Sequence, residues 1–235
     1  MSEKSTSTTA FDPQSMLLYI DSNLIVINKQ AGLLSIQDGY NLSLPHLATV
    51  FKPKYGKVWI IHRLDKETSG VMLLGRNAQT HRVLNEQFKN RTIEKIYHCL
   101  VMDNPLWNSK LVNLPLLKDA DRLHRTRVNN KKGKPAMTVF KVLKRFERYA
   151  LLECQIFTGY THQIRAHLFH MKMQILGDTL YCSSEQRNIG REIFGLTRLG
   201  LHAYSIAFQH PHDDQRMQLT APYPHDFKSL AAPQI

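Results

Sequence analysis

Hydrophobic and polar residues alternate along the chain in short runs, most of which have the composition of β-strands. Eight runs are rich in β-branched and aliphatic residues, and turn-forming residues separate them. They cover residues 17–20, 23–29, 57–62, 70–74, 95–102, 136–146, 149–157 and 201–208. The pattern predicts a domain built mainly on a β-sheet.

Two segments between these runs have helical spacing. Residues 80–88 place Leu84 and Phe88 on one face, and residues 161–171 follow a turn, with Thr161 as the predicted N-cap. Strands and helices do not alternate regularly along the chain. We therefore expect an α+β fold, with a mixed, mostly antiparallel sheet and flanking helices, rather than a doubly wound one.

Length and composition are typical of one folded domain in a reducing compartment. The chain has 235 residues, 43% of them hydrophobic, and we expect a single domain over 11–235 after a disordered Ser/Thr-rich tail, 1–10. The longest apolar run, 16–20, is far shorter than the roughly 20 residues that cross a membrane. Without a secretory signal at its start, the chain is predicted to be cytoplasmic. Its three widely spaced cysteines predict reduced thiols.

The charge distribution points to a polyanionic partner. The net charge is +12, and residues 61–147 carry 18 basic and 8 acidic side chains. Within that region, residues 122–145 hold nine basic side chains and no acidic one, a pattern suited to RNA or DNA. The alternative is a solvated basic loop without a partner. The predicted phosphate contacts are Arg122, Arg125, Arg127, Lys131, Lys132 and Lys134.

The strongest candidate for chemistry is the polar loop 62–70, which two apolar strands flank. If the first strand continues with a period of two, Arg63 and Asp65 point to the same side. A cation nearby favours the carboxylate form, which can act as a nucleophile or a base. The alternative is a surface turn in which Asp65, Thr68 and Ser69 cap backbone amides.

A second polar segment surrounds Arg165, which lies near the start of a predicted helix. A cation there opposes the helix dipole, so we expect an anionic partner, either Asp65 or an RNA phosphate. His162, His167 and His170 do not have the spacing of a metal motif, and no metal site is predicted. Phosphate-loop, dinucleotide-binding, serine-hydrolase and deaminase motifs are also absent from the sequence.

Six motifs in a fixed order connect these segments with a known family. They are Asn28-Lys29 with Ala31-Gly32-Leu33, His62-Arg63-Leu64-Asp65 with Thr68-Ser69-Gly70, Phe88 with Arg91, Lys95 and Tyr97, Thr158-Gly159 with Thr161-His162-Gln163-Ile164-Arg165 and His167, Gly177-Asp178 with Tyr181, and Leu201-His202-Ala203 with Phe208, His210 and Pro211. From about residue 17 to 224, the chain resembles the RluA family of RNA pseudouridine synthases.

The resemblance implies an isomerase that converts uridine to pseudouridine in RNA, on the pseudouridine synthase fold with a central RNA-binding cleft. Such an enzyme flips its target nucleotide into a pocket, and neither cofactor nor metal is expected. Asp65 is the implied catalytic aspartate, Tyr97 the residue that stacks on the base and Arg165 the partner of the aspartate. Arg63 is the implied occupant of the vacated place in the RNA. Further implied RNA contacts are His62, Thr68, Tyr160, His162 and Gln163.

Alternatives remain open at this point. Tyr97 can be a core residue of a strand, and Arg165 a phosphate contact. Tyr160 stands where the family usually has Arg or Lys, and Gln30 where it usually has Pro. The short chain most resembles the RluA branch without an S4 domain, which acts on large-subunit rRNA and a tRNA anticodon stem-loop, and we expect a monomer. A catalytically silent RNA-binding module and a nucleic-acid glycosidase are the competing functions.

Overall fold

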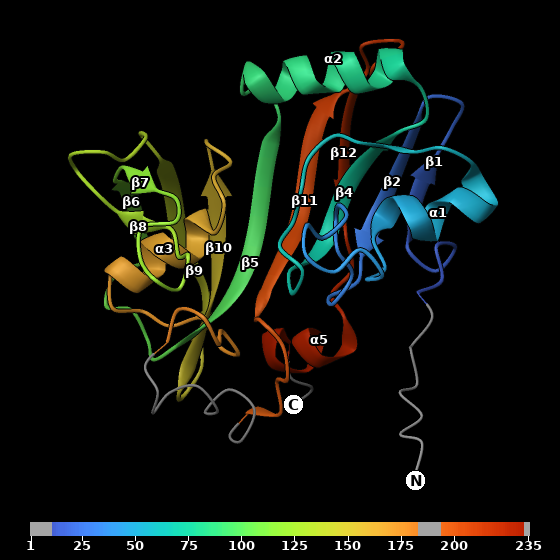
Figure 1. The fold of residues 1–235 in the computed structure, drawn as a ribbon. Helices are drawn as coiled ribbons and strands as arrows, with labels where there is room; N and C mark the ends of the chain where they lie inside the picture. The colour runs from blue at the N-terminus through green and yellow to red at the C-terminus, as the bar shows by residue number, and fades with distance from the viewer. Residues whose placement is uncertain (1–10, 183–193, 233–235) are drawn as a thin grey trace, which may run out of the picture.

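The computed structural model describes residues 11–182 and 194–232, whose arrangement is shown in Figure 1. The predicted disordered tail, residues 1–10, lies outside the described residues. The described helices are α1 (Leu47–Tyr55), α2 (Ala78–Lys89), α3 (Gln163–His170) and α5 (His225–Ala231). Within these two ranges, no helix has both the length and the apolar composition that crossing a bilayer requires.

A ten-stranded sheet forms the centre of the fold. In order across the sheet, its main strands are β1 (Leu17–Ile20), β2 (Leu24–Lys29), β4 (Ser69–Gly75), β11 (Leu201–Gln209), β5 (Glu94–Met102), β10 (Tyr149–Ile156), β9 (Met137–Arg145) and β6 (Ser109–Asn113). In addition, β3 (Trp59–Ile60) pairs with β4, β12 (Arg216–Thr220) pairs with β11, and β7 (Leu116–Leu117) and β8 (Arg127–Val128) form a separate pair. The strand pairs are antiparallel except for β4 and β11, which are parallel. The predicted α+β fold with a mixed, mostly antiparallel sheet is confirmed.

Helices pack on both faces of the sheet. Figure 1 shows α1 and α2 beside the half formed by β1, β2 and β4, and α3 beside β9 and β10. Alternate side chains of β5 face opposite sides. Cys99 belongs to the cluster that contains Leu168 of α3, whereas Leu100 packs with Phe227 of α5. Tyr97 packs against the α3 cluster too, so it faces the same side as Cys99.

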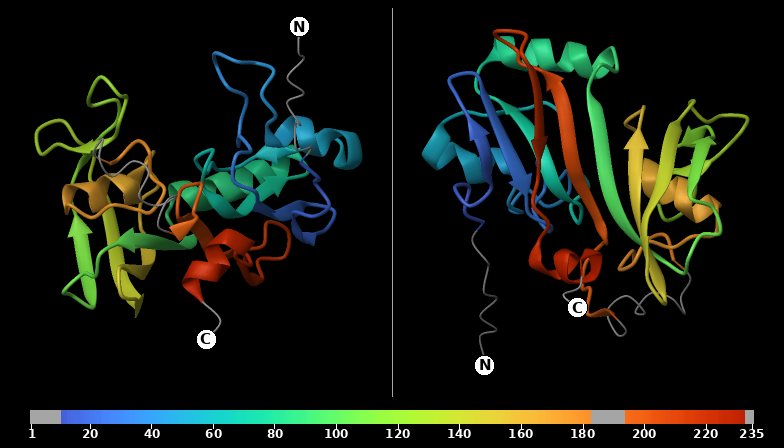
Figure 2. Two further views of the ribbon diagram at one scale, coloured as in Figure 1. Left: turned by 90° about the horizontal axis from the view of Figure 1, so that it is seen from below. Right: turned by 180° about the vertical axis from the view of Figure 1, so that it is seen from behind.

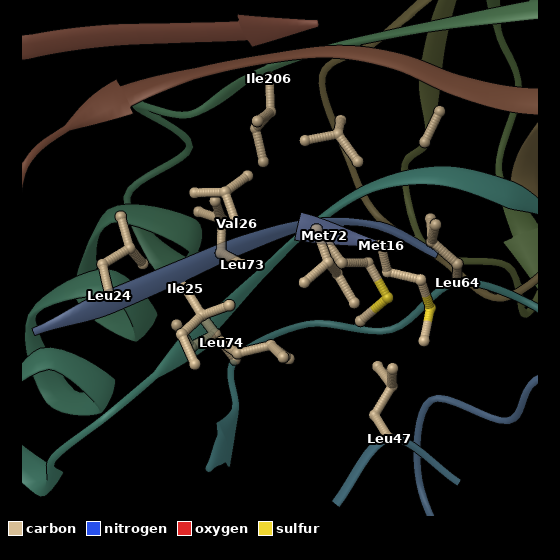
Figure 3. Packing of buried hydrophobic residues seen from close by; sticks show 14 of the residues in the cluster. Met16, Leu24, Ile25, Val26, Leu47, Leu64, Met72, Leu73, Leu74 and Ile206 are labelled. Carbon is tan, nitrogen blue, oxygen red and sulfur yellow. The ribbon is translucent and has the colours of Figure 1, made fainter. Parts of the chain in front are cut away.

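The half of the sheet that contains β2 and β4 is covered on both faces. All seven residues of β4 and five of the six residues of β2 are buried. Figure 3 shows how these strands pack with Met16, Leu47 and Ile206. A strand that is buried on both faces needs apolar residues at every position, which explains the unbroken apolar runs 24–27 and 71–74.

The parallel contact between β4 and β11 depends on a glycine. Gly70 pairs with Ala203 and has a φ of +119°. A Cβ atom at Gly70 would lie 2.2 Å from the carbonyl oxygen of Ala203, so no side chain fits there. This close approach joins the two halves of the sheet immediately after the polar loop 62–68.

Two local predictions are wrong. Strand β3 ends at Ile60, so the alternation does not continue into the loop: Ile61 and Leu64 are both buried, and Arg63 is exposed. Helix α3 has His162 as its N-cap residue instead of Thr161. His162 adopts the left-handed conformation, with φ 56°, which histidine visits more often than most residues.

Candidate active site

Buried hydrogen bonds hold the polar loop between β3 and β4 in place. The hydroxyl group of Ser35 donates to the carbonyl oxygen of Leu64 at 2.7 Å and accepts from its N–H at 3.0 Å. The Nζ of Lys29 donates to the carbonyl oxygens of residues 30, 33 and 66, and burial lowers its pKa to about 7. Asp65 therefore belongs to a loop whose backbone is held in place by the side chains of Ser35 and Lys29.

Asp65 lies beside two residues at the start of α3. Its Oδ2 atom accepts a hydrogen bond from Nη1 of Arg165 at 3.3 Å and lies 3.6 Å from Nε2 of His162. The carboxylate side chain is 26% exposed, so it remains accessible to a ligand. The structure thus joins the two polar segments, 100 residues apart in sequence, and the arginine expected to need an anionic partner lies against this aspartate.

A second carboxylate, that of Asp178, fixes the orientation of Arg165. Asp178 accepts hydrogen bonds from Nε and Nη2 of Arg165, both at 2.8 Å, and is almost completely buried. The guanidinium group also lies 4.9 Å from the ring centroid of Tyr181. Burial opposes the positive charge, but the hydrogen bonds and charge of Asp178, together with the charge of Asp65, raise the pKa of Arg165.

Asp65 opens onto a cavity of about 590 Å³. Two segments flank this cavity, residues 34–36 after β2 and Lys118 after β7. Figure 2 (left) shows the chain between β2 and α1 and the chain around β7 and β8 extending from the same face of the sheet. Nine predicted site residues line the cavity, namely His62, Arg63, Asp65, Thr68, Tyr97, Tyr160, His162, Gln163 and Arg165.

The cavity wall contains a histidine and a tyrosine that are uncharged near pH 7, and a lysine whose pKa is lowered. Burial, with a contribution from Lys95, lowers the pKa of His62 to about 3, and Nε2 of His62 accepts the N–H of Leu73. Burial and the charge of Asp65 raise the pKa of Tyr97. Burial and the charge of Arg91 lower the pKa of Lys95 to about 8. The cavity therefore combines an aromatic hydroxyl and a neutral imidazole with a charged carboxylate.

Three of the residues predicted to contact RNA also have structural roles. The Gln163 amide is 3% exposed and makes four internal hydrogen bonds, which use all of its donors and acceptors. These bonds join the chain before α3 to β9, and the RNA contact of Gln163 stays a prediction. Thr68 is 2% exposed, and its N–H closes the turn onto the carbonyl oxygen of Asp65. Tyr160 packs partly against the apolar cluster that contains Ala166.

The basic segment 122–145 lies outside the cavity lining. Some of its basic side chains pair with an acidic residue, and others are exposed. Arg125 and Arg127 both pair with Asp121, at 2.8 and 3.2 Å, and both lie against the ring of Phe169. Arg125 is thus held by the protein, and its predicted contact with an RNA phosphate stays a prediction. The exposed basic residues of the predicted set are Arg122, Lys131, Lys132 and Lys134.

Sequence reasoning missed four residues that shape the site. Asp178 and Tyr181 were known only as members of a motif, because their contacts with Arg165 depend on the tertiary fold. Phe88 and Lys95 also line the cavity, and the ring of Phe88 lies 4.8 Å from that of His62. Among the described residues, no group of three or more His, Cys, Asp or Glu side chains is arranged to hold a metal ion.

Comparison with known proteins places the chain in a family. Residues 23–170 match the family model described as RNA pseudouridylate synthase. The chain therefore belongs to the RNA pseudouridylate synthase family, as its motifs predict. A solved structure, human RNA pseudouridylate synthase domain containing 4, is similar with a TM-score of 0.74 and 26% identity, over 91% of this chain and 90% of that one.

Curated relatives carry two kinds of name. The chain is 34% identical over 210 residues to ribosomal large subunit pseudouridine synthase C of Vibrio parahaemolyticus, covering 88% of this chain and 65% of that protein. It is 32% identical over 216 residues to the dual-specificity RNA pseudouridine synthase RluA of Pasteurella multocida, covering 92% of this chain and 96% of that one. The chain thus spans about two thirds of the length of the first of these relatives and nearly all of the second.

Proposed function

We propose that this protein isomerises a uridine to pseudouridine in structured RNA, with Asp65 as the catalytic carboxylate. The observation that carries the proposal is an accessible aspartate, held by the Arg165–Asp178 pair, in the cavity of a chain that belongs to the RNA pseudouridylate synthase family. In this reaction the bond between C1′ and N1 breaks and a bond between C1′ and C5 forms. C5 loses a proton and N1 gains one, so no co-reactant is required.

The residues around Asp65 are suited to a flipped nucleotide. Tyr97 presents a ring that stays neutral, and an aromatic ring next to a base contributes about 1–3 kcal/mol by stacking. Arg165 orients Asp65 through the hydrogen bond from its Nη1 atom to Oδ2 of Asp65. Arg63 is exposed at the cavity rim, where it can occupy the space that the base leaves in the RNA.

The exposed basic side chains outside the cavity fit a larger RNA. Lys131 and Lys132 lie in a turn that Lys134 follows. These three residues and Arg122 are exposed, and they can contact phosphates at a distance from the flipped base. Because relatives are named for the ribosomal large subunit and for dual specificity, we propose large-subunit rRNA as the first substrate and a tRNA anticodon stem-loop as the second. We further propose that the protein acts as a monomer in the cytoplasm, without cofactor or metal.

The test is the mapping of pseudouridine by sequencing in cells with and without this gene, followed by assays on transcripts of the mapped RNA. Asp65→Asn keeps the side chain's shape and is expected to abolish turnover, with RNA affinity within about tenfold, or ~1.4 kcal/mol. Glu67→Gln is the matched control, because it removes an exposed carboxylate of the same loop outside the cavity lining.

Three outcomes contradict the proposal or a part of it. If Asp65→Asn forms product at a near-normal rate, Asp65 is not the catalytic group. If the wild-type protein binds RNA tightly but leaves every uridine unchanged, the protein is a silent RNA-binding module. Loss of activity on addition of a chelator contradicts the metal-free reaction.

A further inference from the structure

The hydroxyl group of Tyr181 lies between the candidate active site and the segment that carries the basic residues. The side chain is 2% exposed and does not line the cavity. Its oxygen accepts the N–H of Thr126 at 2.8 Å and donates to the carbonyl oxygen of Thr126 at 3.0 Å. The same oxygen lies 3.2 Å from Nδ1 of His162. One buried hydroxyl group therefore serves three partners.

Counting hydrogens assigns the tautomer of His162. A tyrosine hydroxyl group has one hydrogen to donate, and in Tyr181 this hydrogen goes to the carbonyl oxygen of Thr126. Its oxygen can then only accept from His162, so Nδ1 of His162 carries a hydrogen. Burial and the charge of Arg165 lower the pKa of His162, against the effect of Asp65, so the ring is neutral near pH 7. Nε2 is left with a free lone pair.

The distance between His162 and Asp65 agrees with this tautomer. Nε2 lies 3.6 Å from Oδ2 of Asp65, beyond the range of a hydrogen bond, as two acceptors without a hydrogen between them should. In the opposite tautomer, Nε2 would carry a hydrogen aimed at the carboxylate and would compete with the substrate for it. Both side chains line the cavity, so a ligand there meets two acceptors side by side.

We propose that Tyr181 is a positioning residue that holds His162 in the Nδ1–H tautomer, so that Nε2 of His162 and the carboxylate of Asp65 together accept a hydrogen-bond donor of the bound nucleotide. This inference rests on the proposed function for the identity of the ligand. A uridine nucleotide offers two donors of this kind, the 2′-hydroxyl group of the ribose and the N3–H of the uracil ring. The tautomer itself is a property of the protein without RNA.

The same short segment also orients the arginine. Asp178 accepts the N–H groups of residues 180 and 181, and thereby fixes the turn that carries Tyr181, while its carboxylate holds Arg165. The ring of Tyr181 lies against the guanidinium group of Arg165 and edge-on to the ring of His162. Both side chains that face Asp65 from α3 are thus placed by residues 178–181.

The first experiment measures the tautomer directly by ¹⁵N NMR of the histidine rings in the RNA-free protein. We expect a protonated Nδ1 and an unprotonated Nε2 for His162 in the wild type, and a shift toward the Nε2–H form in Tyr181→Phe. Tyr223→Phe is the matched control, because the Tyr223 hydroxyl group meets Nδ1 of another buried histidine, His98, outside the cavity lining. An Nε2–H tautomer for His162 in the wild type would overturn the inference.

The second experiment measures single-turnover rates at saturating RNA on the substrate found by mapping. Tyr181→Phe and His162→Asn, which keeps a donor near the Nδ1 position but lacks Nε2, should both be slower by tenfold or more. Tyr223→Phe should stay within twofold of the wild type. Equal rates for Tyr181→Phe and Tyr223→Phe would overturn the positioning role.

A third measurement identifies the donor through RNA affinity. Target RNAs with 2′-deoxyuridine or 3-methyluridine at the reactive position each lack one donor. The deletion that weakens binding to the wild type but not to His162→Asn marks the partner of Nε2. If each modified RNA loses as much affinity for His162→Asn as for the wild type, Nε2 of His162 does not accept either donor, and this part of the inference is wrong. Failure of the proposed function appears differently, as a wild-type protein that makes no pseudouridine while its His162 keeps the assigned tautomer.

Discussion

The buried pair of Arg165 and Asp178 sets a quantitative expectation for stability. The two side chains are 9% and 1% exposed and share two hydrogen bonds of 2.8 Å. Removing one partner of such a pair leaves an uncompensated buried charge and costs about 3–5 kcal/mol. In Asp178→Asn one carbonyl acceptor remains, and Asp65 still lies 3.3 Å from Arg165. We therefore expect the lower end of this range, a loss of about 3 kcal/mol in the free energy of unfolding.

The assay is urea unfolding at pH 7.5, followed by circular dichroism, with a thermal melt as a second measurement. For a chain of this length, about 3 kcal/mol corresponds to a decrease of roughly 6–12 °C in Tm. Asp226→Asn is the matched control. Asp226 makes the same two-bond contact, at 2.7 and 2.9 Å, with Arg198, but its side chain is 35% exposed.

Solvent screens the Asp226 pair, so we expect Asp226→Asn to cost about 1 kcal/mol or less. A loss below about 1 kcal/mol for Asp178→Asn would refute the reasoning, because the buried charge of Arg165 would then be compensated without Asp178. Equal losses for the two variants would refute it as well, since burial would then make no difference to the value of an Arg–Asp pair.

Three other changes test separate parts of the molecule. Replacing Lys131, Lys132 and Lys134 with Gln should weaken binding of many RNAs similarly and reduce the log–log salt slope by up to about 0.7–0.9 per lost contact; an unchanged slope would show that they are merely solvated. Gly70→Ala should cost roughly 3 kcal/mol or more in urea unfolding, because its Cβ meets the backbone of β11, whereas Gly56→Ala, with open space around its Cβ, should cost about 1 kcal/mol. Three histidines have a folded-state pKa of about 3 or 4, below the 6.5 of the unfolded chain, so the unfolded state binds more protons below pH 6.5 and stability falls there. They are His62, His98 and His202. At pH 5.5, each of these histidines should lower the free energy of unfolding by about 1 kcal/mol relative to pH 7.5. Equal stability at the two pH values would contradict this.

The sequence predicts most clearly the strands whose burial dictates their composition. Strands β2 and β4 are covered on both faces, so their apolar runs are unmistakable. Strand β12 has no buried residue, and its polar sequence resembles a loop. Helix α1 contains Pro53, which weakens a helical pattern, although the helix forms and packs Leu47 and Phe51 into the core. These elements depend on tertiary partners that a local pattern does not reveal.

The candidate site divides in the same way. The contact between Asp65 and Arg165 was one of two predicted from the sequence, because a cation at a helix start favours a nearby anion, and Asp65 and an RNA phosphate were the two candidates. The role of Asp178 could not, since its contact with Arg165 arises from the packing of α3 on the chain that follows it. The direction of Arg63 was mispredicted because β3 ends at Ile60, where the loop turns away from the alternation of the strand.

The position of β11 determines when the protein can fold during synthesis. This strand lies between β4 and β5, although about 100 residues separate the end of β5 from its start. At a synthesis rate of about 5–20 residues per second, the edges of β4 and β5 that pair with β11 remain unpaired for roughly 5–20 s after β5 is made. Unpaired strand edges attract other chains, so this interval is when the nascent protein is most exposed to aggregation and most dependent on chaperones. The domain is completed only when residues 201–209 insert between its two halves.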